Sequence, residues 1–151
     1  MSRLQEEIKQ SKPFPNLRTE ALVSIIRTAA VINHLLNEVL KPFGITMTQY
    51  NVLRILRGAE EQGLCGREIG DRLVSPVPDV TRLLDRMEEM KLLTRQRSLV
   101  DRRYVSTHLS DAGRALLVEV DPRLESVANM RFNHLDAESL KALIATLEAL
   151  R

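Results

Sequence analysis

The order of elements predicted between residues 66 and 109 constrains the fold of this 151-residue chain more than any other feature. Residues 66–74 (GREIGDRLV) have the pattern of a short helix, and residues 75–93 (SPVPDVTRLLDRMEEMKLL) have that of a longer one. Residues 92–97 and 103–109 then alternate as two strands do, and the segment SLVD joins them. A pair of helix-turn-helix proportions followed at once by a hairpin predicts a mainly helical, α+β domain.

The second helix of this pair carries a start signal and two different faces. We expect it to begin with Ser75 as its N-cap and Pro76 at the first helical position, where the missing N–H of proline is tolerated. Its apolar and polar side chains fall on opposite faces, as in an amphipathic helix with one side in a core. The apolar face comprises Val80, Leu83, Leu84 and Met87, and the polar face comprises Pro78, Arg82, Asp85 and Glu89.

Positive charge is concentrated in the predicted hairpin. Residues 91–103 hold five basic side chains and one acidic one, whereas the other 138 residues hold 17 basic and 19 acidic side chains. A local basic patch of this kind is an electrostatic footprint for phosphate, although a solvated surface loop can have the same composition. In a winged helix-turn-helix, the second helix enters the major groove of DNA and the hairpin reaches the adjacent backbone or minor groove. The five basic residues are Lys91, Arg95, Arg97, Arg102 and Arg103.

Long amphipathic helices are predicted on both sides of this unit. The first ends at Pro42 and Gly44, and the last carries a stripe of leucine and isoleucine. These helices offer more apolar surface than a winged helix of about 75 residues can cover, so we expect a homodimer interface to bury the remainder. The chain then divides into a polar arm, 1–16; an N-terminal dimerisation helix, 17–44; the winged helix-turn-helix, 45–114; and C-terminal dimerisation helices, 115–151.

Capping signals mark the starts of two further helices. Thr46 and Gln49 have the spacing of a capping box, at the start of a helix that we expect Gly58 to end. Ser110 is expected to cap the first C-terminal helix, with Asp111 in its first turn, where negative charge complements the helix dipole.

The composition is that of an ordinary globular protein of a reducing compartment. Cys65 is the only cysteine, so no internal disulfide can form. The charged N-terminal residues lack the apolar stretch of a signal peptide, and no later apolar run is expected to span a bilayer, which predicts a cytoplasmic protein without a membrane partner. His34, His108 and His134 lack the spacing of metal ligands, so we expect no metal. The sequence also contains no nucleophile–base pair or phosphate-binding loop at usable spacing, so neither an enzyme nor a cofactor is expected.

Three motifs follow one another along the predicted winged unit. Asp101-x-Arg103, followed by Leu109, Ser110 and Gly113, matches a D-x-R…L-[ST]-x-x-G pattern. The segments GITMTQYNVLRIL and VTRLLDRMEEMKLLTR extend the match upstream. In this order the motifs resemble the MarR (multiple antibiotic resistance regulator) family of transcription factors, over effectively the whole domain. The resemblance implies an obligate homodimer in which N- and C-terminal helices interlock between subunits.

The resemblance also assigns roles to single residues. Arg103 enters the minor groove and Asp101 holds its guanidinium in place, while Arg102 lacks a partner in the pattern and is expected to contact phosphate. From its position on the second helix of the pair, and not from the resemblance, Arg86 is expected to contact phosphate, while Asp79 either faces DNA or serves only the helix dipole. The predicted DNA-binding residues are Ser75, Pro78, Asp79, Thr81, Arg82, Arg86, Arg97, Asp101, Arg102 and Arg103.

The sequence thus predicts a homodimeric, sequence-specific transcriptional regulator that binds an inverted repeat in double-stranded DNA. We expect a repressor that a small aromatic effector releases. His34 and Tyr50 either line the effector pocket that the resemblance implies or only pack in the interior. Cys65 is expected to be structural, because no neighbour in the sequence clearly lowers its pKa. The alternative function is a winged helix that contacts protein instead of DNA, which a wing of opposite or mixed charge would favour.

Overall fold

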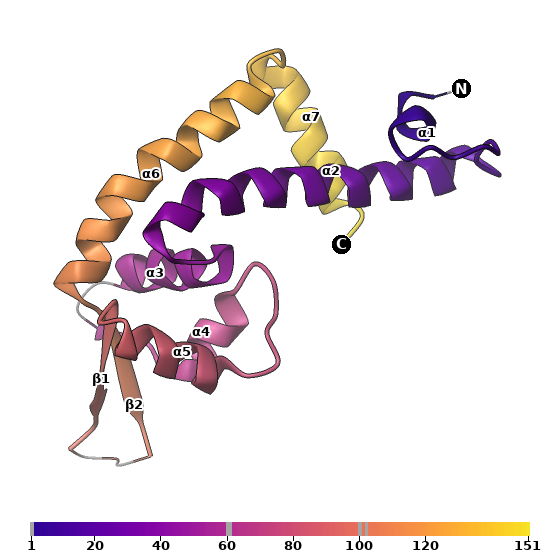
Figure 1. Ribbon diagram of the computed structural model, residues 1–151. Coiled ribbons are helices and arrows are strands. Elements are labelled where there is room, and N and C mark those ends of the chain that lie inside the picture. The colour runs from indigo at the N-terminus through magenta and orange to yellow at the C-terminus, as the bar shows by residue number, and fades with distance from the viewer. Residues whose placement is uncertain (1, 60–61, 100, 102) are drawn as a thin grey trace.

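The computed structural model, which describes residues 2–59, 62–99, 101 and 103–151, is mostly helical with one small antiparallel sheet. Its elements are α1 (Arg3–Glu7), α2 (Leu17–Leu40), the 3-10 helix η1 (Lys41–Phe43), α3 (Met47–Ala59), α4 (Gly66–Arg72), α5 (Val80–Glu89), β1 (Leu93–Arg97), β2 (Val105–Leu109), α6 (Asp111–Phe132) and α7 (Ala137–Glu148). The predicted winged helix-turn-helix, with long helices on both sides, is confirmed. In Figure 1 the β1–β2 hairpin, or wing, projects from one end of the molecule and α2 extends away from it.

The N-terminal arm contains a helix that the sequence pattern does not predict. Gln5 of α1 is buried, and its side-chain oxygen accepts a hydrogen bond from the backbone N–H of Ser2 at 2.8 Å. Glu7 Oε2 lies 3.7 Å from Arg27 Nε of α2, and this half-exposed ion pair links α1 to that helix only weakly. A helix of five residues carries too little apolar periodicity to be recognised from its sequence.

Three helix boundaries are predicted between residues 42 and 58, and two of them are confirmed. Gly44 follows η1 in the left-handed conformation, with a φ of 69°, which closes the long α2 unit. The Thr46 N–H donates to the Gln49 side chain at 2.9 Å and the Gln49 N–H donates to the Thr46 hydroxyl at 3.2 Å, as a capping box requires. Gly58, however, does not end α3, because an exposed glycine costs a helix only about 1 kcal/mol relative to alanine.

The predicted start of α5 is wrong. Its N-cap is Asp79, whose carboxylate accepts a hydrogen bond from the Arg82 N–H at 2.9 Å. A helix that began at Pro76 would place Pro78 at its third position, where proline has no N–H to donate to the Ser75 hydroxyl. Pro78 also disfavours the helical conformation in the residue before it. The helix therefore begins after Pro78, with Asp79 instead of the expected Ser75 as its N-cap.

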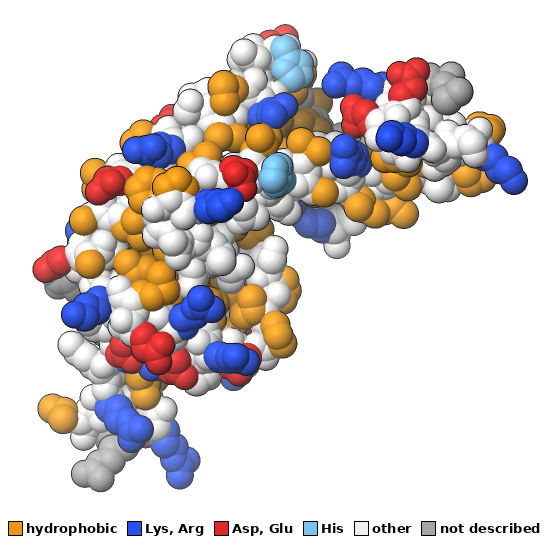
Figure 2. Space-filling model, viewed as in Figure 1, with side chains coloured by type: hydrophobic (Ala, Val, Ile, Leu, Met, Phe, Trp, Pro, Cys, Tyr) orange, Lys and Arg blue, Asp and Glu red, His pale blue; other side chains and the backbone are white. Residues whose placement is uncertain are grey.

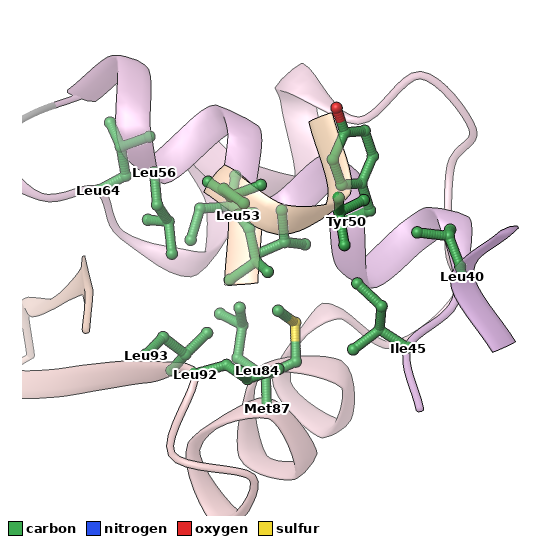
Figure 3. Packing of buried hydrophobic residues seen from close by; sticks show 14 of the residues in the cluster. Leu40, Ile45, Tyr50, Leu53, Leu56, Leu64, Leu84, Met87, Leu92 and Leu93 are labelled. Atoms are coloured by element: carbon green, nitrogen blue, oxygen red, sulfur yellow. The ribbon is translucent and has the colours of Figure 1, made fainter. Parts of the chain in front are cut away.

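One apolar core holds the winged unit together and fixes the orientation of α5. Figure 3 shows Leu53 and Leu56 of α3 facing Leu84 and Met87 of α5, while the Tyr50 hydroxyl at the edge points away from the cluster. Leu84 and Met87 are almost completely buried. The opposite face of α5 must therefore lie toward solvent.

The wing is attached to α5 by a tight turn. β1 and β2 pair with Leu93 opposite Leu109 at the base and Arg97 opposite Val105 near the tip. At the end of α5, Lys91 adopts a left-handed φ of 61°, its N–H donates to Glu88 O, and the following N–H donates to Met87 O. These two bonds form a Schellman motif, so the direction in which the wing leaves α5 is defined.

The helices outside the winged unit expose much apolar surface. The exposed residues include Leu17, Leu22, Ile25 and Ile26 on α2, and Leu143, Ile144 and Leu147 on α7. The segment Leu17–Phe43 is also long and apolar enough to cross a membrane by length and composition alone, so the expectation that no run reaches that length is wrong. A single helix of this kind is weak evidence for a membrane span, because the core helix of a soluble protein passes the same test.

Candidate nucleic-acid interface

The N-terminal part of α5 forms the first half of the candidate interface. Its predicted contact residues are exposed, because the opposite face of the helix is held in the core by Leu84 and Met87. Asp79 is the helix cap, so its carboxylate is occupied by a backbone N–H. The exposed residues are Pro78, Asp79, Thr81, Arg82 and Arg86.

The wing forms the second half of the interface. Arg97 at the end of β1 and Arg103 beyond the tip are exposed. Figure 2 shows basic side chains on the projecting wing at the lower end of the molecule. Arg102 lies outside the described residues. The predicted contact residues that can be placed here are thus free to meet a partner.

The side chain of Asp101 contacts the main chain of Arg103. Its carboxylate accepts a hydrogen bond from the backbone N–H of Arg103 at 2.9 Å, and its carbonyl accepts one from the Tyr104 N–H at 3.0 Å. Among the described residues, no ion pair joins Asp101 to the Arg103 guanidinium. A short aspartate side chain reaches the backbone N–H two residues ahead and forms an Asx turn. This turn does not require the flexible arginine side chain to be ordered.

Arg95 is one of the five basic residues of the predicted hairpin, but it does not lie on the exposed surface of the wing. Its side chain is only 23% exposed, and Nη2 lies 2.6 Å from Asp85 Oδ1 and 2.6 Å from Glu88 Oε2. Hydrogen bonding to Glu88 raises the pKa of the guanidinium above its usual value. Counting charges missed this role. Strand alternation places Arg95 on the same side of β1 as the buried Leu93, but it places the exposed Arg97 there as well, so alternation alone does not distinguish the two arginines.

Ser75 and Tyr50 lie beside a cavity between α2, α3 and the loop after α4. The cavity has a volume of about 350 Å³, and Ser75 lies in the loop, outside α5. His34 is exposed on α2 and does not line this cavity. The lining residues include Asn33, Met47, Tyr50, Arg54, Val74 and Ser75.

A polar network joins Tyr50 to α6. The Tyr50 hydroxyl donates to Asp121 Oδ1 at 2.7 Å and accepts from Arg54 at 3.0 Å, while Arg57 donates to Asp121 Oδ2 at 2.6 Å. Burial raises the pKa of Tyr50, so its hydroxyl remains a donor at neutral pH. Burial alone would raise the pKa of Asp121, but the hydrogen bonds from Arg57 and Tyr50 hold it below its usual value. Sequence reasoning missed Asp121, because its partners are 64 and 71 residues away.

Cys65 is the N-cap of α4 and is half-buried. Its backbone N–H donates to Glu68 at 2.8 Å, and this bond lowers the pKa of the Glu68 carboxyl. In the described part of the chain, no group of three or more His, Cys, Asp or Glu side chains could hold a metal ion.

Comparison with known proteins identifies relatives of this arrangement. The MarR family model matches residues 43–103, which include α3, the helix pair α4–α5 and the first strand of the wing, β1. The HTH-type transcriptional regulator TtmR of Methylorubrum extorquens (strain PA1) is 37% identical over 107 residues, which are 71% of this chain and 53% of TtmR. This chain thus matches about half the length of that relative.

Solved structures match over nearly the whole chain. A MarR transcription factor from Planctomyces limnophilus is 34% identical, with a TM-score of 0.70, over 91% of this chain and 99% of its own. A MarR variant from E. coli in complex with operator DNA is 24% identical, with a TM-score of 0.74, over 99% of both chains. At that identity the second match supports the fold alone, and both agree with a winged helix-turn-helix.

Proposed function

The chain belongs to the MarR family of transcriptional regulators, and on that basis we propose that it is a cytoplasmic homodimer that binds an inverted repeat in double-stranded DNA. In this proposal α5 reads the major groove and the wing reaches the adjacent minor groove. The predicted contacts are those of the exposed face of α5 together with Arg97, Arg102 and Arg103 of the wing.

The observation that carries the proposal is the common exposure of two surfaces. The cap and first turns of α5 face solvent, and so do Arg97 and Arg103 at the end of the same compact unit. The Schellman turn at Lys91 connects the two surfaces directly. A basic wing beside an exposed helix face suits a phosphate-rich partner and argues against the alternative of a protein-binding winged helix.

A second copy of the chain would cover the apolar faces of α2 and α7. Leu22 and Ile26 of α2 are 58% and 60% exposed. A continuous apolar helix face that is this exposed in a single chain marks a surface for a partner. A membrane is a poorer occupant than a second copy. Arg27 lies near the middle of α2, where a charge inside a bilayer would be costly.

Selection of duplexes from a random library by the wild-type protein tests DNA recognition. We expect an inverted repeat with half-sites ~10 bp apart from centre to centre. Affinity for the selected duplex should fall steeply as salt rises, because phosphate contacts release counterions. Equal affinity for selected and scrambled duplexes at every salt concentration would refute the proposal.

Sedimentation at micromolar concentration tests the dimer. Ile26→Glu and Ile144→Glu each place a carboxylate in the proposed interface and should produce monomers or unfolded protein. Val74→Glu makes the same kind of change at a residue that is 85% exposed in the loop before α5, and it should remain dimeric. A well-folded monomeric wild-type protein would contradict the proposed assembly.

We also propose that the protein represses transcription until a small aromatic effector binds in the cavity beside Tyr50. Its volume of about 350 Å³ suits a ligand of one or two rings. A panel of aromatic acids should contain a compound that raises the melting temperature and releases the selected duplex. Asn33→Trp fills the cavity from α2 and should abolish both effects while DNA binding remains. A reporter that becomes less active when the gene is deleted would argue against repression.

A further inference from the structure

An interface with two reading elements depends on the spacing between them. If α5 and the wing enter different grooves of one duplex, a small change in their relative angle separates one of them from its contact. A two-stranded hairpin is marginally stable alone, so the wing depends on its contacts with the body of the protein. Two backbone hydrogen bonds between Thr107 and Leu64 hold β2, so the contacts between β1 and α5 decide how well the other strand of the wing, and with it Arg103, is placed.

We propose that Arg95 is a positioning residue that fixes the wing against α5, an inference that rests on the proposed DNA-binding function. Its guanidinium Nη2 contacts Asp85 Oδ1 at 2.6 Å and Glu88 Oε2 at 2.6 Å, and its Nε contacts Glu88 Oε2 at 2.9 Å. The backbone N–H of Arg95 donates to Glu88 Oε1 at 3.1 Å. The strand is thus held through both its main chain and its side chain.

This clamp fixes a second point along the wing. The Schellman turn at Lys91 fixes where the chain leaves α5, but it lies at the very base of the hairpin. Arg95 is the central residue of β1, so its contacts restrain rotation of the hairpin about that base. A planar fork with several donors can hold two carboxylates at a defined angle, which an ammonium group cannot.

The clamp also changes the charge of the surface that DNA would meet. Asp85 and Glu88 lie on α5, and their side chains are 51% and 39% exposed. Figure 2 shows acidic side chains gathered where the wing meets the body of the protein. Arg95 offsets one of the two negative charges of Asp85 and Glu88. A variant that only removed Arg95 would therefore both release the wing from α5 and leave the charges of Asp85 and Glu88 without a counter-ion. The experiment must separate these two effects.

The first experiment measures binding of the wild-type-selected duplex by fluorescence anisotropy. Arg95→Met keeps the length of the side chain but removes the guanidinium, and we expect affinity to fall at least tenfold. Arg95→Lys should recover only part of this loss. The triple variant Asp85→Asn, Glu88→Gln, Arg95→Met removes the unbalanced carboxylates as well. If Arg95 acts by position, the triple variant stays weak; return to wild-type affinity would reduce its role to charge neutralisation and overturn the proposal.

The second experiment asks whether Arg95 acts through Arg103. Arg103→Ala should weaken binding about tenfold in the wild-type protein but less than threefold in Arg95→Met, because a misplaced wing has less contact to lose. A direct phosphate contact by Arg95 predicts additive losses and a salt slope reduced by about one. A purely structural role predicts a lower melting temperature with an unchanged cost of Arg103→Ala. Either result would overturn the proposal.

Melting curves and sedimentation must show that each variant is folded and dimeric before affinities are compared. Binding of the selected and scrambled duplexes by the wild-type protein distinguishes failure of the proposed DNA-binding function from failure of the role of Arg95. If the wild-type protein does not distinguish the selected duplex from a scrambled one, the proposed function fails. If it does so and the two Arg103→Ala losses are equal, only the role of Arg95 fails.

Discussion

The carboxylate of Asp101 accepts a hydrogen bond from the backbone N–H of Arg103, with 2.9 Å between Oδ1 and N. This bond forms an Asx turn at the point where the wing reverses. The backbone N–H of Asp101 in turn donates to the Ser98 hydroxyl at 3.2 Å. Asp101 therefore orients Arg103 through the main chain, and the guanidinium remains available to a partner.

The first prediction separates this turn from the charge of Asp101. Asp101→Ala removes the acceptor and should weaken binding of the selected duplex several-fold, although it also removes a negative charge from a DNA-facing surface. Asp101→Asn keeps a side-chain oxygen at the same place and should bind at least as well as wild type. Anisotropy titrations measure both affinities. Tighter binding by a folded Asp101→Ala dimer would show that the carboxylate acts only by repulsion.

The second prediction concerns Arg103 itself. Arg103→Ala should weaken operator binding by about 1–3 kcal/mol, as expected for one groove contact. The double variant with Asp101→Ala should lose less than the sum of the two single losses, because an absent arginine needs no orienting turn. Strictly additive losses, measured on variants with unchanged melting temperatures, would mean that the two residues act independently.

Local sequence signals predicted those parts of the fold in which both partners lie close in the chain. The Thr46–Gln49 capping box spans three residues, and Ser110 caps α6 by accepting from the Gly113 N–H at 2.9 Å. Helical and strand periodicity gave the order of the elements, because burial of one face repeats within a few residues. The winged fold could therefore be predicted before any contact was known.

Roles that depend on distant partners could not be predicted in the same way. Arg95 is one of five basic residues in its segment, and only its neighbours on α5 distinguish it from Arg97. Asp121 is unremarkable in the sequence, yet it joins α3 to α6 through Tyr50 and Arg57. Charge composition gives the sign of a surface, whereas pairing in three dimensions decides which charges are free to bind DNA.

The third prediction tests the corrected start of α5. Asp79→Ala should lower the free energy of unfolding by about 1 kcal/mol, since the Arg82 N–H loses its acceptor. Asp79→Asn keeps an acceptor and should be near neutral. Ser75→Ala should change stability by less than about 0.5 kcal/mol, because Ser75 is exposed and caps no helix. Urea unfolding measures all three, and a larger loss in Ser75→Ala than in Asp79→Ala would restore the original boundary.

The fourth prediction follows from the pKa of Asp121, which is lower in the folded protein than its usual value. A lowered folded-state pKa means that the stabilisation is complete above the unfolded-state pKa of about 3.9 and disappears as pH falls below it. Asp121→Asn should cost about 1 kcal/mol at pH 7, a figure reduced for partial exposure, and should flatten the decline below pH 4.

Asp71→Asn is the control for this pH dependence. Asp71 lies 4.0 Å from Arg67, and both side chains are well exposed, so the substitution should have little effect on stability. Urea unfolding between pH 3 and 7 compares the three proteins. If Asp71→Asn and Asp121→Asn flatten the curve equally, the Tyr50–Asp121–Arg57 network is not the source of the acid sensitivity.

The fifth prediction compares two glycines in helices. A Cβ on Gly113 would overlap the carbonyl oxygen of Leu92 and lie 2.8 Å from Leu109 Cδ1, whereas a Cβ on Gly58 would meet nothing within 4 Å. Leu92 O also accepts from the Ser110 N–H, so the backbone at the base of the wing cannot move without breaking the start of α6. Gly113→Ala should therefore destabilise the protein by roughly 1–3 kcal/mol, while Gly58→Ala should stabilise it by about 0.5–1 kcal/mol through better helix propensity. Urea unfolding of the two variants measures the difference, and a neutral Gly113→Ala would mean that α6 can shift away from Leu92 at little cost.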